Sequence, residues 1–404
     1  MYHSTTRVVL LSSASIAATF LALSGSAQAQ STTCSQTGTT ITCVDGTATV
    51  LTATTTPATT TVPGPGLVTV ATTGPSTTTY TATGPIATTN VGAVNLTSTG
   101  GALTFVPTGT TAPVNIRTTG GTGANGVLLN TVGQAATVTV GNISTTGTDS
   151  FGVRSNGGTD LTLRTGDITT TGAGSRGISA SAQTGVVNIV AGNLTTADRA
   201  ISVSTTSNAT VVAGNVSSGT SGVLASSSNG NVGITTGNVI AANGFGVTGQ
   251  TVPGTGTGSV VVRTGAVTST NGAGVGGSAF NTGGGVDVGG PTVTSSRPNS
   301  AAVFAQNNGT GALTVNCGTV TNVGNNAVFV NSSGTPNGGN IAITTNSLAA
   351  SNTAFSTLFA RTAGTGTITV NAGTVTGGAN TAGSVRLASI LTVGLGRSMR
   401  ATAT

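Results

Sequence analysis

The stretch TVTVGNISTTGTDSFGVRS at positions 137–155 decides the fold, because the chain repeats its pattern many times. LTLRTGDITTTGAGSRGISA at 161–180 and VNIVAGNLTTADRAISV at 187–203 are two further copies. Self-similarity at a period of this size indicates stacked units, none of which can bury its apolar residues alone. The stretch therefore predicts a solenoid.

One residue anchors each copy, and neighbouring anchors lie 22–28 residues apart except across one gap that holds two copies. Apolar residues stand three and five positions before the anchor and two positions after it, which is the period-two alternation of a strand with one buried face. Later in each copy a small residue precedes an apolar one, as in Gly152-Val153 and, in the copy after Asn346, Ala354-Phe355. The pattern predicts an all-β, right-handed parallel β-helix with about three short strands per coil of 22–28 residues. The anchors are Gly141, Gly166, Gly192, Gly214, Gly237, Gly265, Gly318, Asn346 and Gly373.

The residue after the anchor is Asn or Asp in five consecutive copies: Asn142, Asp167, Asn193, Asn215 and Asn238. These side chains tolerate a left-handed backbone and can form hydrogen bonds along a stack. We therefore interpret the five residues as a structural corner ladder, and Asp167 as a corner residue rather than a catalyst.

The N-terminus has the three parts of a secretory signal peptide at positions 1–29. Arg7 supplies the positive charge, an apolar core follows, and Ala27-Gln28-Ala29 is a small-x-small cleavage site. No later run approaches the roughly 18 apolar residues of a membrane span, so the mature chain is expected to have no transmembrane helix. We expect a Thr- and Pro-rich N-terminal cap at 30–64, β-helix repeats at 65–384 and a C-terminal tail at 385–404.

Export permits disulfide bonds, and the chain has three cysteines. Cys34 and Cys43 lie in the predicted cap, on either side of a short segment that ends in TGTTIT. We interpret them as a candidate disulfide across a small hairpin or first coil. Cys317 stands just before its anchor, where other copies have Ala or Thr. It is interpreted as a small buried filler.

The residues of most active sites are missing from the mature chain. Charged residues make up 4% of the sequence, all bases are Arg, and the one histidine, His3, lies in the signal peptide. Glycoside hydrolysis needs two carboxylates at a set separation, but Asp149, Asp160 and Asp198 fall in different columns of the repeat. We therefore expect no catalytic residue, no metal site, no cofactor and no enzymatic activity.

A net charge of +6 and a pI of about 10.6 would suit a nucleic-acid binder. The arginines are scattered and aromatic residues are rare, so no nucleic-acid partner is expected. Arg176 and Arg199 share one column of the repeat with Phe151 and Phe245. That column is either a weakly basic recognition stripe or a set of unrelated solvent-facing side chains.

A signal peptide, an early pair of cysteines and degenerate copies of G-N-[IV]-x-T-x-G together resemble the passenger region of Gram-negative autotransporters, over about residues 30–384. The resemblance implies a β-helix displayed at the cell surface for adhesion, aggregation or biofilm formation. In that family a C-terminal outer-membrane barrel follows, and here the 19 residues after Val385 are too few for one. A separate outer-membrane translocator is one expectation, and retention in the periplasm without it is another.

The expected function is therefore that of an exported, non-enzymatic protein of the cell surface or extracellular space, in adhesion, aggregation or structural display. Its expected partner is a host-cell or abiotic surface, a glycan or another copy of the chain. A self-assembling extracellular fibre is the alternative, because stacked low-charge strands are close to the physics of cross-β assembly. A polysaccharide-acting β-helix enzyme is a more distant one.

Overall fold

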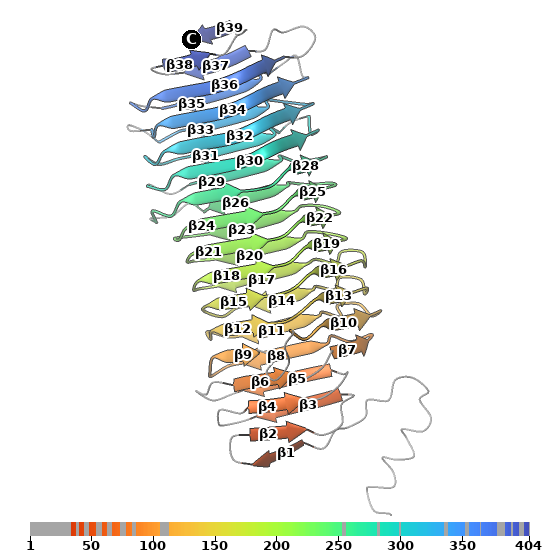
Figure 1. Ribbon diagram of the computed structural model, residues 1–404. Helices are drawn as coiled ribbons and strands as arrows, with labels where there is room; N and C mark the ends of the chain where they lie inside the picture. Colours follow the sequence, from red (N-terminus) through yellow and green to blue (C-terminus); the bar gives the residue numbers. More distant parts are fainter. Residues whose placement is uncertain are drawn as a thin grey trace, which may run out of the picture.

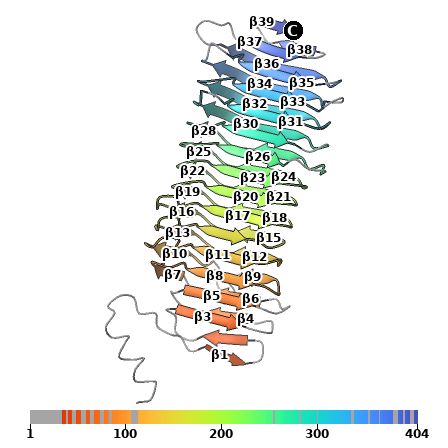
Figure 2. The same ribbon diagram turned by 180° about the vertical axis from the view of Figure 1, so that it is seen from behind.

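The computed structural model describes residues 86–377 except 106–112, 253–255, 281–282, 299, 335–337, 352–354 and 364, and also the backbone of the strands between 34 and 82 and between 384 and 403. The described chain is a right-handed parallel β-helix. Figures 1 and 2 show a single rod, with β1 at one end and β39 at the other. The fold class predicted from the repeat is confirmed.

Each coil contributes to two sheets of the rod. In the described chain the first and second strands of the coils belong to one sheet of 24 strands, and the third strands form another of 15 strands. The third strands are β3 (Ala48–Ala53), β5 (Leu67–Thr72), β8 (Val94–Ser98), β11 (Val127–Thr131), β14 (Val153–Asn156), β17 (Ile178–Gln183), β20 (Ile201–Thr205), β23 (Val223–Ser227), β26 (Val247–Thr251), β29 (Val275–Ala279), β31 (Val303–Asn307), β33 (Val328–Ser332), β35 (Leu358–Thr362), β37 (Ser384–Ala388) and β39 (Arg400–Ala403).

The first strands pair in parallel, each with the first strand of the next coil. They are β2 (Thr40–Cys43), β4 (Thr59–Val62), β6 (Thr78–Ala82), β9 (Leu103–Phe105), β12 (Ala136–Thr139), β15 (Leu161–Arg164), β18 (Val187–Ala191), β21 (Ala209–Ala213), β24 (Val232–Thr236), β27 (Val260–Arg263) and, at the end of the ladder, β38 (Leu391–Leu395). The second strands are β7 (Ile86–Thr89), β10 (Ile116–Thr119), β13 (Ile143–Thr145), β16 (Ile168–Thr170), β19 (Leu194–Thr196), β22 (Val216–Ser218), β25 (Val239–Ala241) and β28 (Val267–Ser269).

Four later coils join their first and second strands into one long strand. These are β30 (Val286–Ser295), β32 (Leu313–Asn322), β34 (Ile341–Ala350) and β36 (Ile368–Thr376). The irregular copy around Gly289-Gly290-Pro291 keeps the register, because Val288 pairs with Val315 and Val293 with Val320. Pro291 thereby occupies the anchor position in this coil.

The register stacks the apolar columns that the sequence predicted. Leu161 pairs with Val187, Val187 with Ala209, and the same column continues through Val260 to Ile368. Its members are buried, with at most 3% of their surface exposed. They form one core along the inside of the rod, and burying each apolar side chain contributes about 1.5–3 kcal/mol.

One assignment within the repeat was wrong. The pair Ala354-Phe355 was expected to start the third strand of one coil, but Leu358 is the residue that pairs with Val328. Phe355 is 43% exposed and precedes the strand. The loop before β35 is three residues longer than expected, and the small-apolar pair within it imitates the start of a strand.

The strands at both ends of the chain continue the same ladders. Within the expected cap at 30–64, β2 pairs in parallel with β4, and β3 with β5. Within the expected tail at 385–404, β38 pairs with β36, and β39 with β37. The signal peptide expected at 1–29 lies outside the described residues. No helix in the described part of the chain is long and apolar enough to span a membrane.

The first two strands form an antiparallel hairpin, β1 (Cys34–Thr37) with β2, in which Cys34 lies directly opposite Cys43. Directly opposed positions bring the two α-carbons within the separation that a disulfide spans. The third cysteine, Cys317, is 3% exposed, and burial raises the pKa of its thiol to about 11. Cys317 is thus the buried filler that the sequence predicted.

We predict that no thiol of the mature chain reacts with a chromogenic thiol reagent at mildly alkaline pH. Unfolding in guanidinium without reductant should expose one thiol, that of Cys317, and unfolding with reductant should expose all three. The Cys317→Ala variant is the control and should show none without reductant. Three reactive thiols in the unreduced, unfolded chain would show that Cys34 and Cys43 are not bonded.

Candidate functional site

The corner between the first and second strands carries a continuous ladder of side-chain hydrogen bonds. The Asn142 Oδ1 atom accepts a hydrogen bond from the backbone N–H of Asp167 at 2.8 Å. Asp167 accepts from the N–H of Asn193 at 2.7 Å, and Asn193 from that of Asn215 at 2.9 Å. Each side chain therefore replaces a backbone carbonyl as the acceptor at the point where the strand direction changes.

The ladder is longer than the five residues singled out from the sequence. Asn115 lies below Asn142 and accepts its N–H at 2.8 Å. At the upper end, Asn238 follows Asn215 and accepts the N–H of Ala266 at 2.9 Å. We call the set Asn115, Asn142, Asp167, Asn193, Asn215 and Asn238 the corner ladder.

The backbone of the corner ladder differs from the left-handed conformation that the sequence suggested. Among non-glycine residues in the described chain, only Asn90 and Asp149 have positive φ. The anchor glycines are needed for space instead. A Cβ at Gly214 would come within 2.7 Å of the Asn193 Oδ1 atom, and one at Gly237 within 2.6 Å of the Asn215 Oδ1 atom.

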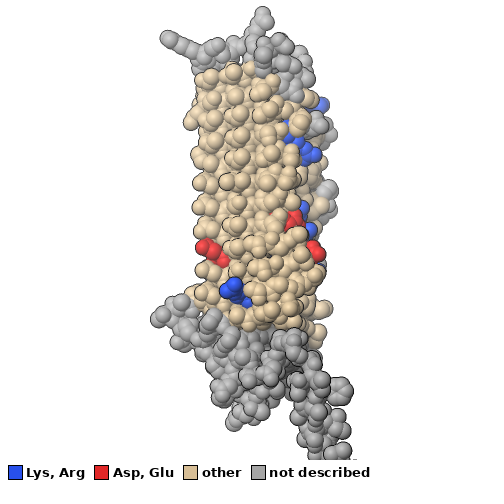
Figure 3. All heavy atoms as spheres, turned by 90° about the vertical axis from the view of Figure 1, so that its right-hand side faces the viewer, with Lys and Arg blue, Asp and Glu red and all other residues tan. Residues whose placement is uncertain are grey.

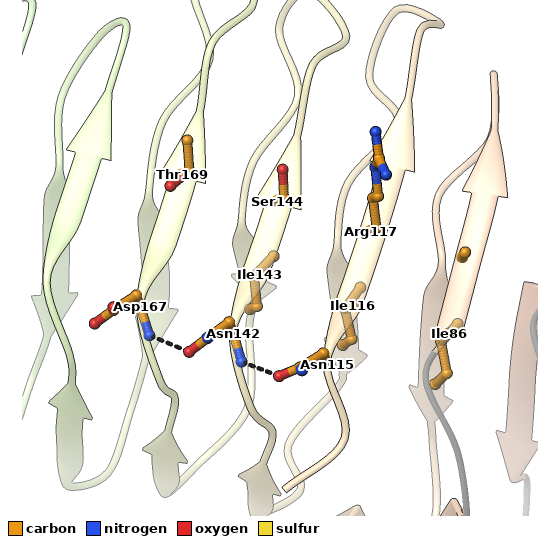
Figure 4. Close-up of a pocket in the computed structure, with 10 residues that line it drawn as sticks. Ile86, Asn115, Ile116, Arg117, Asn142, Ile143, Ser144, Asp167 and Thr169 are labelled. Carbon is orange, nitrogen blue, oxygen red and sulfur yellow. Dashed lines mark hydrogen bonds between the residues drawn. The ribbon is translucent and has the colours of Figure 1, made fainter.

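An open groove of about 510 Å³ runs beside the lower part of the corner ladder. Figure 4 shows the exposed side chains of Asn115, Asn142 and Asp167 along one edge. Arg117, Ser144 and Thr169 point outward from β10, β13 and β16 along the other. We call this feature the corner groove.

The groove has unused hydrogen-bonding capacity. The Oδ1 atoms of Asn115 and Asn142 accept backbone bonds, but within the described residues their amide groups donate none. The exposed Arg117 has neither an ion pair nor a hydrogen bond to the described part of the chain. Amide and hydroxyl groups thus recur along the groove at the inter-strand spacing of about 4.8 Å. Arg117 adds one guanidinium group to them.

The face that carries the second strands has few charges. In Figure 3 this face is covered by rows of uncharged side chains, with a few charged groups near its lower part and along one edge. The outward residues of the second strands are mostly Ser and Thr, including Ser144, Thr169, Thr195 and Ser217. Such a surface offers many weak polar contacts and little long-range attraction.

The aspartates weighed as catalytic candidates all have structural surroundings. Asp160 accepts the N–H of Val186 at 2.7 Å, at the corner where the first strand begins. Asp149 occupies a turn with φ of 50°, and Asp287 forms an ion pair with Arg263. Within the described chain no three His, Cys, Asp or Glu side chains lie close enough together to hold a metal ion; Asp45 lies outside it.

The arginines and aromatics of the suggested recognition stripe are partly brought together. The guanidinium carbons of Arg154 and Arg176 lie 5.2 and 5.8 Å from the centre of the Phe151 ring. Arg176 also forms an ion pair with Asp198, the neighbour of Arg199. Phe245 lies two coils above Arg199 in the same column and is 41% exposed.

The pKa of Asp198 is lowered despite partial burial. Burial alone would raise it, but hydrogen bonds from Thr220 and Arg176 and the positive charges of Arg176 and Arg199 outweigh that effect. The Thr220 hydroxyl donates to one carboxylate oxygen at 2.6 Å and the Arg176 Nε–H to the other at 2.8 Å. Asp198 therefore stays ionised at neutral pH with both oxygens engaged.

Sequence reasoning missed an aromatic ladder on the third strands. Phe304, Phe329 and Phe359 point outward from successive coils, and the rings of Phe329 and Phe359 stack 5.0 Å apart at 8°. The ring of Phe304 covers Gly276, where any Cβ would collide with it. The misplaced start of β35 hid the third member, because Phe359 follows Leu358.

The fold and these sites define the class of the chain as a right-handed parallel β-solenoid with a polar corner groove. Comparison with known proteins gives no narrower class, since no family model, no curated protein and no solved structure matches the chain.

We predict that Asp167→Ala lowers the free energy of unfolding by about 1 kcal/mol, the usual net contribution of a hydrogen bond. Asp167→Asn keeps the acceptor oxygen and should retain most of the stability. The measurement is urea unfolding followed by circular dichroism. If both variants lost the same stability, the negative charge rather than the acceptor would be the contribution of Asp167.

Proposed function

We propose that this chain is an exported, non-enzymatic rod that acts in adhesion, aggregation or structural display at the cell surface or in the extracellular space. The observation that carries the proposal is the second-strand face, where a column of hydroxyls runs along the rod and an open groove lies beside its lower part. A surface of this kind binds through many weak contacts spread over several coils. It suits a long, hydroxyl-rich or flat partner such as a glycan or a solid surface.

The N-terminal sequence supports export, because positions 1–29 have the composition of a signal peptide. The resemblance to autotransporter passengers supports display at the surface of a Gram-negative cell. The engagement of Asp160, Asp167, Asp198 and Asp287 in hydrogen bonds or ion pairs supports a role without catalysis.

The alternative is a self-assembling extracellular fibre, and the oligomeric state separates it from a displayed rod. We expect residues 30–404 to elute as an elongated, β-rich monomer in size-exclusion chromatography with light scattering and circular dichroism. The reason is that neighbouring coils of the same chain already pair both edges of the described inner strands. Filaments whose amount rises with concentration would support the fibre and contradict this expectation.

Adhesion through the second-strand face can be tested with Thr169→Trp, which fills the corner groove. Beads coated with the mature chain should attach to glycan-coated and uncoated surfaces, and the variant should reduce attachment severalfold with an unchanged circular dichroism spectrum. Thr162→Trp is the matched control, because Thr162 is the same residue type in the same coil and points outward from the first strand β15 instead. Equal attachment by both variants would show that another face is responsible.

A further inference from the structure

We propose that Arg154, Arg176 and Arg199 form a binding site for a sulfate or phosphate ester group. The three residues come from consecutive coils, on or just before β14, β17 and β20. This oxyanion site is separate from the corner groove, and its assignment stands whether or not the chain is displayed as an adhesin.

Two of the guanidinium groups contact the same aromatic ring. Arg154 and Arg176 both lie within 6 Å of the Phe151 ring centre, at 5.2 and 5.8 Å. Cation–π contacts position each group. The Nε–H of Arg176 is bound to Asp198 and that of Arg154 to Asn156, and the terminal Nη groups of both make no hydrogen bond to the described residues. Both groups are positively charged, so an anion that contacts both of them is favoured electrostatically.

The site has more positive than negative charge. Its three arginines face one engaged carboxylate, that of Asp198, whose two oxygens are taken by Arg176 and Thr220. Asp149 is exposed on the neighbouring turn and forms no ion pair with the described residues. Even with Asp149 counted, the local charge remains positive.

Arg199, like Arg154, makes one long hydrogen bond within the described chain. Its Nη1 atom makes one long hydrogen bond, 3.4 Å, to the Ser202 hydroxyl. Its Nε atom is shielded from solvent and has no partner in the described structure. A guanidinium group has five N–H donors in a planar fork, so most of the hydrogen-bonding capacity of Arg199 is unused.

These features fit a tetrahedral oxyanion better than a neutral ligand. Guanidinium groups bind phosphate and sulfate oxygens in bidentate pairs, which are stronger than neutral hydrogen bonds. Guanidinium groups from neighbouring coils can together engage the oxygens of ester groups carried along a chain or a surface. The ligand is therefore a sulfated glycan or a phosphate headgroup, and an experiment can separate these two sources.

The test uses the immobilised mature chain and four probes: dextran sulfate, unsulfated dextran of the same length, inorganic phosphate as a competitor, and phosphatidylcholine vesicles with and without phosphatidic acid. We expect dextran sulfate or the phosphatidic acid vesicles to bind, and phosphate to compete. The Arg154→Gln/Arg199→Gln double variant should lower the affinity about tenfold or more, as expected for the loss of charge-assisted hydrogen bonds. Arg199→Lys keeps the charge but loses the fork, so its affinity should be intermediate.

Arg164→Gln is the matched control, because Arg164 is an exposed arginine on the first strand β15, outside the site. A chain with a net charge of +6 attracts any polyanion, and this control measures that general effect. Equal losses in the control and the double variant would overturn the proposal, as would the absence of binding to both anionic probes at low salt. Should the double variant lose its β spectrum, Arg154→Gln alone is the second test. Arg154 is exposed, and within the described chain it makes one hydrogen bond, 3.4 Å to Asn156, besides its contact with the Phe151 ring.

Discussion

Parallel backbone pairing between successive coils is the constraint on which the rest of this structure depends. A coil cannot bury its own apolar residues, and a shift of one residue would turn a whole column from the core to solvent. The spacing of paired residues nevertheless varies, for example 26 residues from Leu161 to Val187 and 22 from Val187 to Ala209. The register holds because length differences are confined to the turns, as the three extra residues before β35 show.

The corner ladder shows how one side chain can change the shape of a coil. In coils where the anchor glycine is followed by Asn or Asp, the side chain of the coil below takes the backbone N–H, and the first and second strands are separate. Where Thr or Ser stands at that position, as at Thr319 and Ser347, the backbone ladder runs through the corner. The result is one long strand, as in β32 and β34. The two strands also stay separate at Ala266, whose N–H is bound by Asn238 of the coil below. The sharp corner therefore accompanies an Asn or Asp acceptor in the coil below.

The sequence was sufficient to predict the fold because each column of the repeat occurs in nine or ten copies. One exception, such as Pro291 at an anchor position, therefore does not obscure the pattern. It was insufficient where a feature depends on turn length. Phe355 was mistaken for the start of a strand, and the stacked Phe329 and Phe359 were missed for the same reason. It was also insufficient for the backbone of the corner, since Asn is compatible with a left-handed residue and with a hydrogen-bonding ladder. Only the structure shows that the second explanation holds.

The scarcity of charge on this rod makes each charged residue informative. Among the described aspartates, Asp160 and Asp167 complete corner hydrogen bonds, and Asp198 and Asp287 pair with arginines.

Arginine is in excess over aspartate, so some guanidinium groups have no such partner. Arg117 stands alone in the corner groove, whereas Arg154, Arg176 and Arg199 gather around Phe151 and Asp198. On a surface that is otherwise mostly hydroxyls and amides, these are the two places where we propose that charge contributes to binding. The repeat placed Arg176 and Arg199 in one column with Phe151, whereas Arg154 lies in a different column, on β14, and its contact with the same ring is seen only in the structure.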